Sequence, residues 1–319
     1  MVAAESEFRK GNPVIAIPCD AVATPPRSTV SVCALLTCFN RRDKTLECLR
    51  ALAGNACLQA VELRAVLVDD GSTDGTAEAV RGEFSWVDVV TSEGSLFWCR
   101  GMHLAFDTAL RSGFDHYLWL NDDTTLRPDA VARLLACEAG LRGRTDAPLI
   151  VIGSTVDPLS GACTYSGERR PSRWQPSRVE RVVPAPMPQR CDTLTGNIVL
   201  IPSRAAQLVG NLDPAFEHAM GDTDYGLRAR SLGVELWVDS GVHGDCAHNP
   251  VAGTYLDESL PIATQWKRML HRKGLPWRSW LIFTRRHTGV MWPLYFAWPY
   301  AKLLVVSPFT AARRRFSPS

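Results

Sequence analysis

One sequence feature limits the possible folds of this chain more than any other. It is a short apolar run that stops at two adjacent carboxylates. Tyr117–Leu120 form the run, and Asn121, Asp122 and Asp123 follow it directly. Such a run is typical of a buried strand. Neighbouring carboxylates at its end repel each other and lose hydration, so they need cations or hydrogen-bond donors. A divalent metal holding substrate phosphates is one such partner, because Mg²⁺ commonly takes only one or two protein carboxylates. A turn that caps the following helix explains the pattern equally well.

Composition sets broad limits on the protein class. The chain has 319 residues, of which 46% are hydrophobic and 21% charged, with a formal net charge of +2. These values are typical of a globular protein with a sizeable core, and the small net charge gives no global sign of nucleic-acid binding. The ten cysteines form no C-x-x-C pair, and no N-terminal charged-then-apolar signal segment is recognisable. We therefore expect a reducing, cytoplasmic location.

Short apolar strands alternate with helices along the first half of the chain. Strands are expected at Val30–Thr37, Val61–Val68, Val87–Thr91, Tyr117–Leu120 and Leu149–Val156, and helices around Leu46–Ala53, Ala77–Phe84, His103–Ser112 and Pro128–Leu141. This alternation predicts an α/β fold: a mostly parallel, Rossmann-like sheet with helices on both faces. Ligands of such sheets bind at the carboxyl ends of the strands. The polar clusters at Asn40, Asp69–Asp70, Arg100 and Asp122–Asp123 all fall at that edge, Arg100 within a loop expected over Gly94–Met102.

The second half adds a further acidic cluster and two loop histidines. Asp192–Ile201 is expected to form a strand, and the region from Gly167 to Arg190 an irregular excursion. A helix then opens with Asp222 and Asp224 in its first turn, where the helix dipole favours acids. Beyond a strand at Val234–Val238, His243 and His248 flank Asp245 in one loop. Two histidines around an acid favour a metal ligand over simple exposure.

The C-terminal segment changes character. Residues 289–306 are apolar and aromatic, but Pro293, Pro299 and Lys302 interrupt them, so they are poorly suited to span a bilayer. Their tryptophans and tyrosines, with the closing Arg313–Arg315, favour an interfacial helix on an anionic membrane surface. A helix packed on the protein's own core explains the pattern almost as well.

Four segments in order resemble family 2 glycosyltransferases, which are inverting enzymes of the GT-A fold. They are Thr37–Asn40, Val68–Thr76, Asn121–Asp123 and Gly221–Arg228, and the resemblance covers roughly residues 30–250. It is strongest to bacterial rhamnosyl- and galactofuranosyltransferases of cell-surface polysaccharide synthesis. It implies a GT-A domain at 29–255 between a flexible arm at 1–28 and a helical extension at 256–319, which is a candidate for membrane association. It also implies a dTDP- or UDP-linked sugar donor, a divalent metal (Mg²⁺ or Mn²⁺), and a saccharide or lipid-linked acceptor.

The resemblance also suggests roles for individual residues. Asp222 matches the general base, although Gly221 stands where relatives usually carry Glu or Asp. Asp123 matches the metal-binding acid, with His243 or His248 as a further metal ligand. We expect the donor site to contain Thr37, Phe39, Asn40, Asp69, Asp70, Arg100, Asn121 and Asp122. We expect the acceptor site to contain Gly196, Asn197, Asp224 and Arg228.

Three alternatives compete with sugar transfer. A nucleotidyltransferase on a similar sheet would show a glycine-rich basic loop after the first strand, where this chain has Phe39–Arg42. A catalytically inactive, membrane-associated binding protein would fit Gly221, but not the retention of the other acids. A nucleic-acid-binding module would use Arg169–Arg190, which offers only Trp174 for base stacking. We therefore expect a metal-assisted glycosyltransferase with no nucleic-acid partner, located in the cytoplasm or peripherally on the inner face of the cell membrane.

Overall fold

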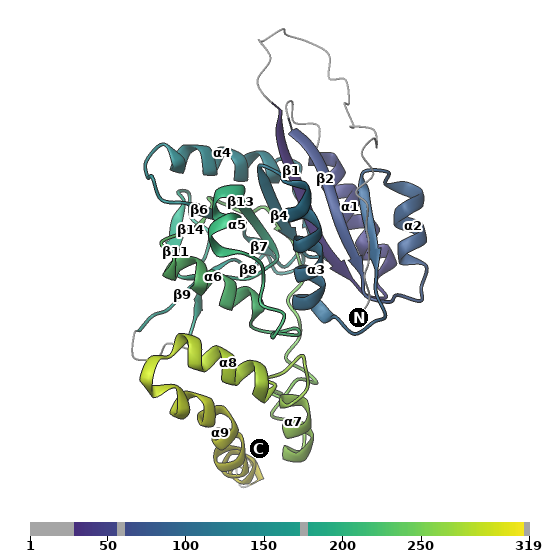
Figure 1. The fold of residues 1–319 in the computed structure, drawn as a ribbon. Coiled ribbons are helices and arrows are strands. Elements are labelled where there is room, and N and C mark those ends of the chain that lie inside the picture. Colours follow the sequence, from purple (N-terminus) through teal and green to yellow (C-terminus); the bar gives the residue numbers. More distant parts are fainter. Residues whose placement is uncertain (1–28, 56–60, 173–177, 316–319) are drawn as a thin grey trace.

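The computed structural model describes residues 29–55, 61–172 and 178–315, with side chains as far as residue 305. The arm expected at residues 1–28, Trp174 and the side chains of Arg313–Arg315 lie outside the described residues. Figure 1 shows a central sheet with helices on both sides and a group of C-terminal helices at one end. The cysteines of the described segments are all free thiols.

Within the described residues the central sheet has eight strands, in the order β11-β14-β6-β13-β4-β1-β2-β3. Strands β1, β2, β3 and β4 run parallel to one another, and β14 runs parallel to β6. Strand β13 lies antiparallel between β4 and β6, and β11 is an antiparallel edge strand. Their bounds are β1 (Val30–Cys38), β2 (Val61–Asp69), β3 (Val87–Thr91), β4 (His116–Leu120), β6 (Leu149–Ile152), β11 (Gln189–Cys191), β13 (Ile198–Pro202) and β14 (Glu235–Val238). The predicted α/β fold with a mostly parallel sheet is confirmed.

Helices cover both faces of this sheet (Figure 1). They are α1 (Arg42–Asn55), α2 (Thr76–Glu83), α3 (Phe97–Ser112), α4 (Ala130–Arg142), α5 (Ser203–Val209) and α6 (Gly221–Ser231). On one face Phe106, Trp119 and Tyr225 form an aromatic core, with ring centroids of Trp119 and Tyr225 4.7 Å apart. On the other face Leu49 and Leu134 pack on the strands. Burial on both faces explains why the strands read as continuous apolar runs.

Helix α3 begins at Phe97, so the loop expected over Gly94–Met102 is largely helical and the prediction was wrong there. The start of a helix leaves backbone N–H groups without partners inside the helix. Here Asp70 accepts hydrogen bonds from the N–H groups of Leu96 (3.0 Å) and Phe97 (2.8 Å). A carboxylate 26 residues upstream therefore stabilises the helix start, which local sequence pattern does not reveal.

The expected strand over Asp192–Ile201 is interrupted. Strand β12 (Thr193–Leu194) leaves the central sheet, and Gly196 lies between it and β13. The region expected to be irregular also contains short strands, which join two small sheets ordered β10-β9-β12 and β5-β15-β7-β8. Their remaining strands are β5 (Thr125–Leu126), β7 (Thr155–Val156), β8 (Cys163–Tyr165), β9 (Gly167–Arg169), β10 (Glu180–Arg181) and β15 (Gly244–Asp245).

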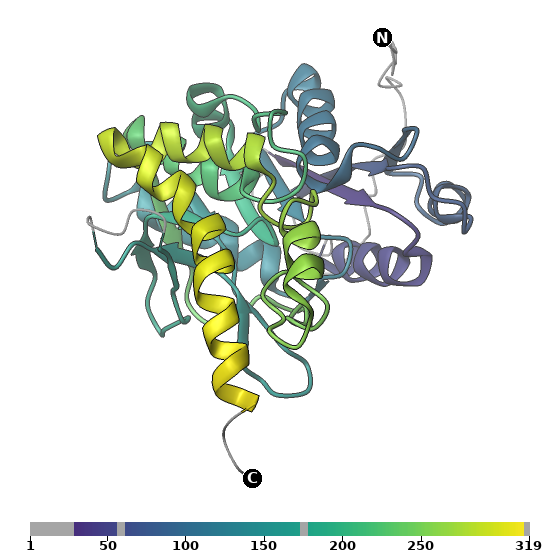
Figure 2. The same ribbon diagram turned by 90° about the horizontal axis from the view of Figure 1, so that it is seen from below.

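The C-terminal extension is helical, as predicted. It contains α7 (Ile262–Met269), α8 (Trp277–His287), the 3-10 helix η1 (Gly289–Met291) and α9 (Trp292–Arg315). Viewed from below, these helices lie in front of the sheet (Figure 2). Trp280 and Phe283 of α8 belong to the same buried core as α3 and α6. Within the described residues, no helix combines the length and hydrophobicity that a membrane span requires.

A buried carboxylate joins the extension to the sheet domain. Asp224 in α6 is fully buried and accepts hydrogen bonds from Nε of Arg228 (2.8 Å) and Nη1 of Arg286 (2.7 Å). Nε2 of His287 lies 2.8 Å from the same carboxylate. Burial alone would raise the pKa of Asp224, but these three partners outweigh it and hold that pKa below its ordinary value. The stabilisation from the ionised carboxylate is therefore present above its unfolded-state pKa, and is lost as the pH falls through the depressed one.

Asp224→Asn should lower the free energy of unfolding by about 3 kcal/mol, because it leaves buried cationic groups without their counter-charge. Urea denaturation followed by circular dichroism measures this change. The matched control is Asp107→Asn, which removes a carboxylate from an exposed ion pair with Arg111 and should cost less than about 1 kcal/mol. Equal effects of the two substitutions would contradict the role of Asp224.

Candidate active site

Two of the polar clusters at the strand ends contribute to one cleft, through Asp70 and Asp122. Strands β1, β2 and β3 end side by side, because Cys38 pairs with Asp69 and Asp69 pairs with Thr91. Strand β4 ends next to β1, directly before Asn121. The cleft is lined by Thr37, Cys38, Phe39, Arg41, Asp70, Gly94, Phe97, Trp98, Asp122, His218 and Lys273. It therefore joins residues at the ends of β1, β2, β3 and β4 with His218 and with Lys273 of the C-terminal extension.

The acids that follow β2 shape the rim of this cleft. Asp70 accepts the hydroxyl of Ser92 at 2.7 Å in addition to its two bonds to the start of α3. Asp69 accepts the N–H of Ser72 at 2.9 Å. Asn40, which adopts a positive φ of 49°, accepts the N–H of Thr73 at 2.8 Å. These side chains fix the loops around the cleft, and Asp70 also lines it.

Arg41 bridges the two carboxylates at the end of β4. Its Nη1 lies 3.1 Å from Oδ1 of Asp122 and 2.7 Å from Oδ2 of Asp123. Burial raises the pKa of Asp122 to about 6, although Arg41 opposes this rise. The second oxygen of Asp122, Oδ2, is buried without a hydrogen-bond partner among the described residues. The site thus holds an acidic pair that a single exposed guanidinium neutralises only in part.

Asp222 is connected to the same place by a chain of contacts. Its Oδ2 accepts the N–H of Gly196 at 3.1 Å. A side chain at position 196 would lie 2.3 Å from the ring of Trp98, so only glycine fits. Nε1 of Trp98 in turn donates to Oδ1 of Asn121 at 2.8 Å, beside Asp122. Burial raises the pKa of Asp222, so this carboxyl takes up a proton more readily than an exposed one.

The structure explains the glycine that precedes Asp222. A Cβ atom at position 221 would lie 2.2 Å from Sγ of Cys99 on α3. The Glu or Asp that relatives usually carry there would therefore not fit in this chain. Close packing of α6 on α3 occupies that space, and Gly221 gives no reason to doubt the neighbouring Asp222.

Several residues expected at the site bind structural partners. Arg228 donates to Asp224 and to the carbonyls of Val209 and Asn211, both at 2.9 Å. Arg100 donates to the carbonyl of Pro214 at 2.9 Å and lies 3.4 Å from Glu217. Neither guanidinium lines the cleft. Asp224 is likewise buried among its hydrogen-bond partners. Arg100, Arg228 and Asp224 therefore have structural roles in this fold.

The two candidate histidines are also engaged elsewhere. His243 is fully buried, and its Nε2 lies 2.7 Å from Oδ2 of Asp239. The ring of His248 stacks on Tyr165 with centroids 6.0 Å apart. Within the described residues, no group of three or more His, Cys, Asp or Glu side chains is arranged to hold a metal ion. Neither histidine is therefore assigned to the metal site.

Three residues beside the site carried no recognisable signal in the sequence. Sγ of Cys246 lies 3.7 Å from Oδ1 of Asp123, and burial raises the pKa of this thiol to about 12, with Asp123 adding to the rise. Asn197 donates to the same sulfur at 3.6 Å. Burial, and then the charge of Asp222, raise the pKa of Glu168 to about 7. Lys273 reaches the cleft from the extension. Each is an isolated residue whose role depends on the tertiary fold.

The acidic pair fits a hard divalent cation. Asp122 and Asp123 offer carboxylate oxygens, and one of them, Oδ2 of Asp122, lacks any partner among the described residues. Mg²⁺ and Mn²⁺ at phosphate sites commonly take one or two carboxylates and complete their shell with phosphate and water. Two carboxylates next to an open cleft meet this requirement without a third protein ligand.

Comparison with known proteins finds a family match. Residues 33–137 match the model of Glycosyl transferase family 2, and they include the segments around Asn40, Asp70 and Asp122. Over these residues the chain is similar to family 2 glycosyltransferases. No curated protein matches it.

Solved structures confirm the GT-A fold of this glycosyltransferase. The mannosyltransferase PcManGT from Pyrobaculum calidifontis, in complex with GDP-Man and Mn²⁺, is 15% identical with a TM-score of 0.52, and the match covers 95% of this chain and 80% of that one. GalNAc-T7 with UDP, GalNAc and Mn²⁺ is 12% identical with a TM-score of 0.52, covering 70% and 46% respectively. At these identities the likeness concerns the fold alone.

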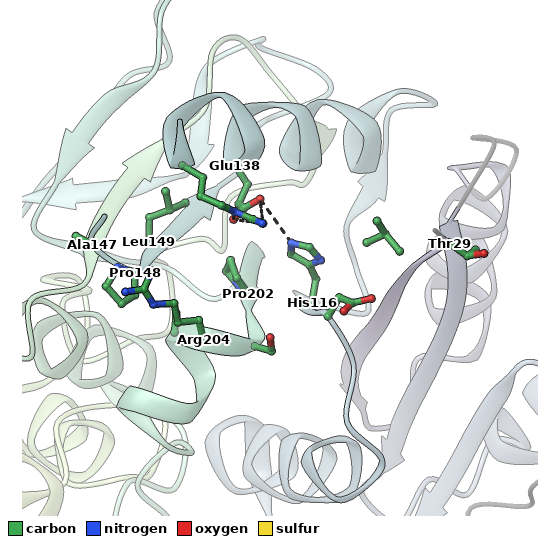
Figure 3. Close-up of a pocket in the computed structure, with 13 residues that line it drawn as sticks. Thr29, His116, Glu138, Ala147, Pro148, Leu149, Pro202 and Arg204 are labelled. Carbon is green, nitrogen blue, oxygen red and sulfur yellow. Dashed lines mark hydrogen bonds and ion pairs between the residues drawn. The ribbon is translucent and has the colours of Figure 1, made fainter. Parts of the chain in front are cut away.

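A separate cavity of about 480 Å³ lies at the opposite end of the sheet. Figure 3 shows its labelled residues, including His116 and Glu138, whose side chains lie 3.7 Å apart. His116 begins β4, whereas Asn121 follows the other end of that strand. The cavity is therefore remote from the acidic pair, and a reaction at that pair would not involve it.

Arg41→Gln should tighten binding of Mn²⁺ in the absence of nucleotide by roughly tenfold, because a competing cation leaves the two carboxylates. Electron paramagnetic resonance of free Mn²⁺ measures the affinity directly. Arg42→Gln is the matched control, since Arg42 is exposed and its side chain makes no ion pair with a described carboxylate. Unchanged or weaker Mn²⁺ binding by the Arg41 variant would show that Arg41 does not compete at this site.

Proposed function

We propose that this glycosyltransferase moves a sugar, with inversion of its anomeric configuration, from a nucleotide-sugar donor to a hydroxyl of a saccharide or lipid-linked acceptor. The observation that carries the proposal is the contact chain from Asp222 through Gly196 and Trp98 to Asn121. This chain of contacts links a carboxyl of raised pKa to the residue that precedes the acidic pair, which supports a role for both in one reaction. A base connected to a donor-activating site suits a direct displacement by the acceptor hydroxyl.

The donor would occupy the cleft. Its nucleotide would lie along the rim formed by Asn40 and Asp70, with the diphosphate toward Asp122 and Asp123. A divalent metal held by these two carboxylates would neutralise the charge that develops on the leaving diphosphate. Arg41 and Lys273 would add positive charge on the protein side. Two structures with the same fold hold Mn²⁺ together with GDP-Man or UDP, which supports a metal and a nucleotide sugar here; the resemblance favours dTDP or UDP as the nucleotide.

Asp222 would act on the acceptor. The N–H of Gly196 holds one of its oxygens, and the N–H of Thr223 holds the other at 2.8 Å. The oriented carboxylate would accept the proton of the acceptor hydroxyl as that oxygen attacks the anomeric carbon and the bond to the diphosphate breaks. A single displacement of this kind inverts the configuration. Glu168, whose pKa of about 7 responds to Asp222, would border the acceptor side.

The resemblance to rhamnosyl- and galactofuranosyltransferases supports a role in cell-surface polysaccharide synthesis, and the extension supports peripheral membrane contact. Apolar side chains on η1 and α9 are strongly exposed: Val290 is 92% exposed, Leu294 64% and Trp298 62%. Residues 290, 294 and 298 repeat every four positions, so they share one face of the helical segment. An exposed apolar stripe with basic residues nearby fits the interface of an anionic membrane.

Asp222→Asn should abolish transfer, with a loss of at least about a hundredfold, while leaving donor binding intact. A panel of nucleotide sugars, beginning with rhamnose- and galactofuranose-linked donors, provides the assay, and EDTA should remove activity that Mn²⁺ restores. Because the base acts in its ionised form and burial raises its pKa, the rate should fall with acid at a pH above the value of about 4 for an exposed carboxyl. Asp107→Asn is the control. Full activity of Asp222→Asn would refute its role as base.

The triple substitution Val290→Ser, Leu294→Ser and Trp298→Ser should reduce co-flotation with vesicles that contain anionic lipid by about tenfold, because it removes the apolar stripe. The matched control replaces three exposed apolar residues outside the extension, Leu159, Val183 and Met187, by serine. Equal flotation of the two variants would rule out membrane contact through this stripe.

A further inference from the structure

A basic groove runs between the loop at residues 253–255 and helix α7. Its volume is about 730 Å³. Lys267, Arg268, His271 and Lys273 line it, and no Asp or Glu occurs among the described residues of its lining. No described carboxylate forms an ion pair with Lys267, Arg268 or Lys273, whereas Arg272 between them is paired with Glu217 at 2.9 Å. Asp257 accepts the N–H groups of Gly253 and Ser259, and the charge of Arg268 also contributes to lowering its pKa. With Asp257 as its one such carboxylate partner, the described lining of the groove carries a net positive charge.

This groove adjoins the donor cleft. Lys273 lines both of them. His218 lines the cleft, and its pKa is lowered to about 4 by burial and then by the charges of Lys273 and His271. Because Lys273 lines both, the groove and the cleft share its positive charge.

The segment that carries Lys273 is held firmly in place. Oε2 of Glu217 accepts Nε of Arg272, and the guanidinium of Arg272 lies 4.8 Å from the centre of the Phe97 ring at the start of α3. The N–H of Gly274 donates to the carbonyl of His271 at 2.8 Å. A Cβ atom at position 274 would lie 2.3 Å from the carbonyl oxygen of Arg268, so the tight turn requires glycine. The backbone that carries Lys273 is thus fixed before any ligand arrives, which reduces the entropic cost of binding.

We propose that this groove binds a phosphate or diphosphate group of the acceptor, beside the donor cleft. The inference rests on the proposed function and assigns its acceptor to a chemical class. Several cations in one groove suit a multiply charged anion better than a single carboxylate. The neighbouring helix α9, which contacts α7 through Tyr300 and Trp266 at a centroid distance of 6.0 Å, carries the exposed apolar stripe. A lipid diphosphate would use both features, and a soluble sugar phosphate only the groove.

The test is the binding of sodium pyrophosphate in the presence of EDTA, measured by isothermal titration calorimetry. Without divalent metal the acidic pair repels the anion, so the groove should dominate binding. Lys267→Gln with Arg268→Gln should weaken binding by about tenfold, since two charge-assisted contacts are lost. Both residues are exposed, so the fold tolerates the change. Arg278→Gln with Lys302→Gln removes the same charge elsewhere on the extension and should change affinity less than about twofold. Equal affinities of the two double variants would overturn the proposal.

Two further ligands distinguish the sources of the anion. If the acceptor is lipid-linked, farnesyl diphosphate should bind the wild-type protein more tightly than glucose 1-phosphate. If the acceptor is soluble, glucose 1-phosphate should bind more tightly. In either case the Lys267 and Arg268 double variant should bind the preferred ligand more weakly; unchanged affinity overturns the groove assignment. Donor hydrolysis by the wild-type protein tests the proposed function without involving this anion. The proposed function and the assignment of the groove can therefore fail independently.

Discussion

The contact between Gly196 and the ring of Trp98 is the constraint on which the site depends. No side chain fits at position 196, so the backbone between β12 and β13 lies directly on the indole. The N–H of Gly196 then reaches Asp222, and Nε1 of Trp98 reaches Asn121. Three segments separated by many residues in the chain are thereby fixed in one place. A methyl group at Gly196 would separate the base from the acidic pair without touching either.

Charge compensation explains how so many acids coexist near this contact. Asp70 bonds the start of α3, Asp122 and Asp123 contact Arg41, and Asp224 contacts the extension. Among these four acids, the pair at the end of β4 relies on an exposed partner, and Oδ2 of Asp122 is buried without a hydrogen-bond partner among the described residues. Buried carboxylates whose hydrogen bonds are all formed stabilise a fold. A carboxylate whose charge and hydrogen bonds are only partly matched can still bind a ligand. The acidic pair is accordingly the part of the network best suited to a metal and phosphate.

The sheet could be predicted because buried strands appear in the sequence as apolar runs. The runs of β1, β2 and β4 end where polar clusters begin. The sequence could not separate binding acids from structural ones, because two of the three partners of Asp224, Arg286 and His287, lie 62 and 63 residues away in α8. The same limit applies to His243, whose partner Asp239 precedes it within an ordinary loop pattern. Cys246 and Lys273 belong to no motif, so only the folded chain brings them to the site.

The extension completes the cleft, and this has a consequence for specificity. The matched family region ends at residue 137, before Asp222, Lys273 and the basic groove. Under the proposed function, the donor side would depend on residues within or close to that region. The acceptor side would be formed instead by α6, α7 and the turn at 271–274, where Arg272 contacts Phe97 and Glu217. Because this part lies outside the shared pattern, acceptor choice can diverge while the donor site and its metal stay the same.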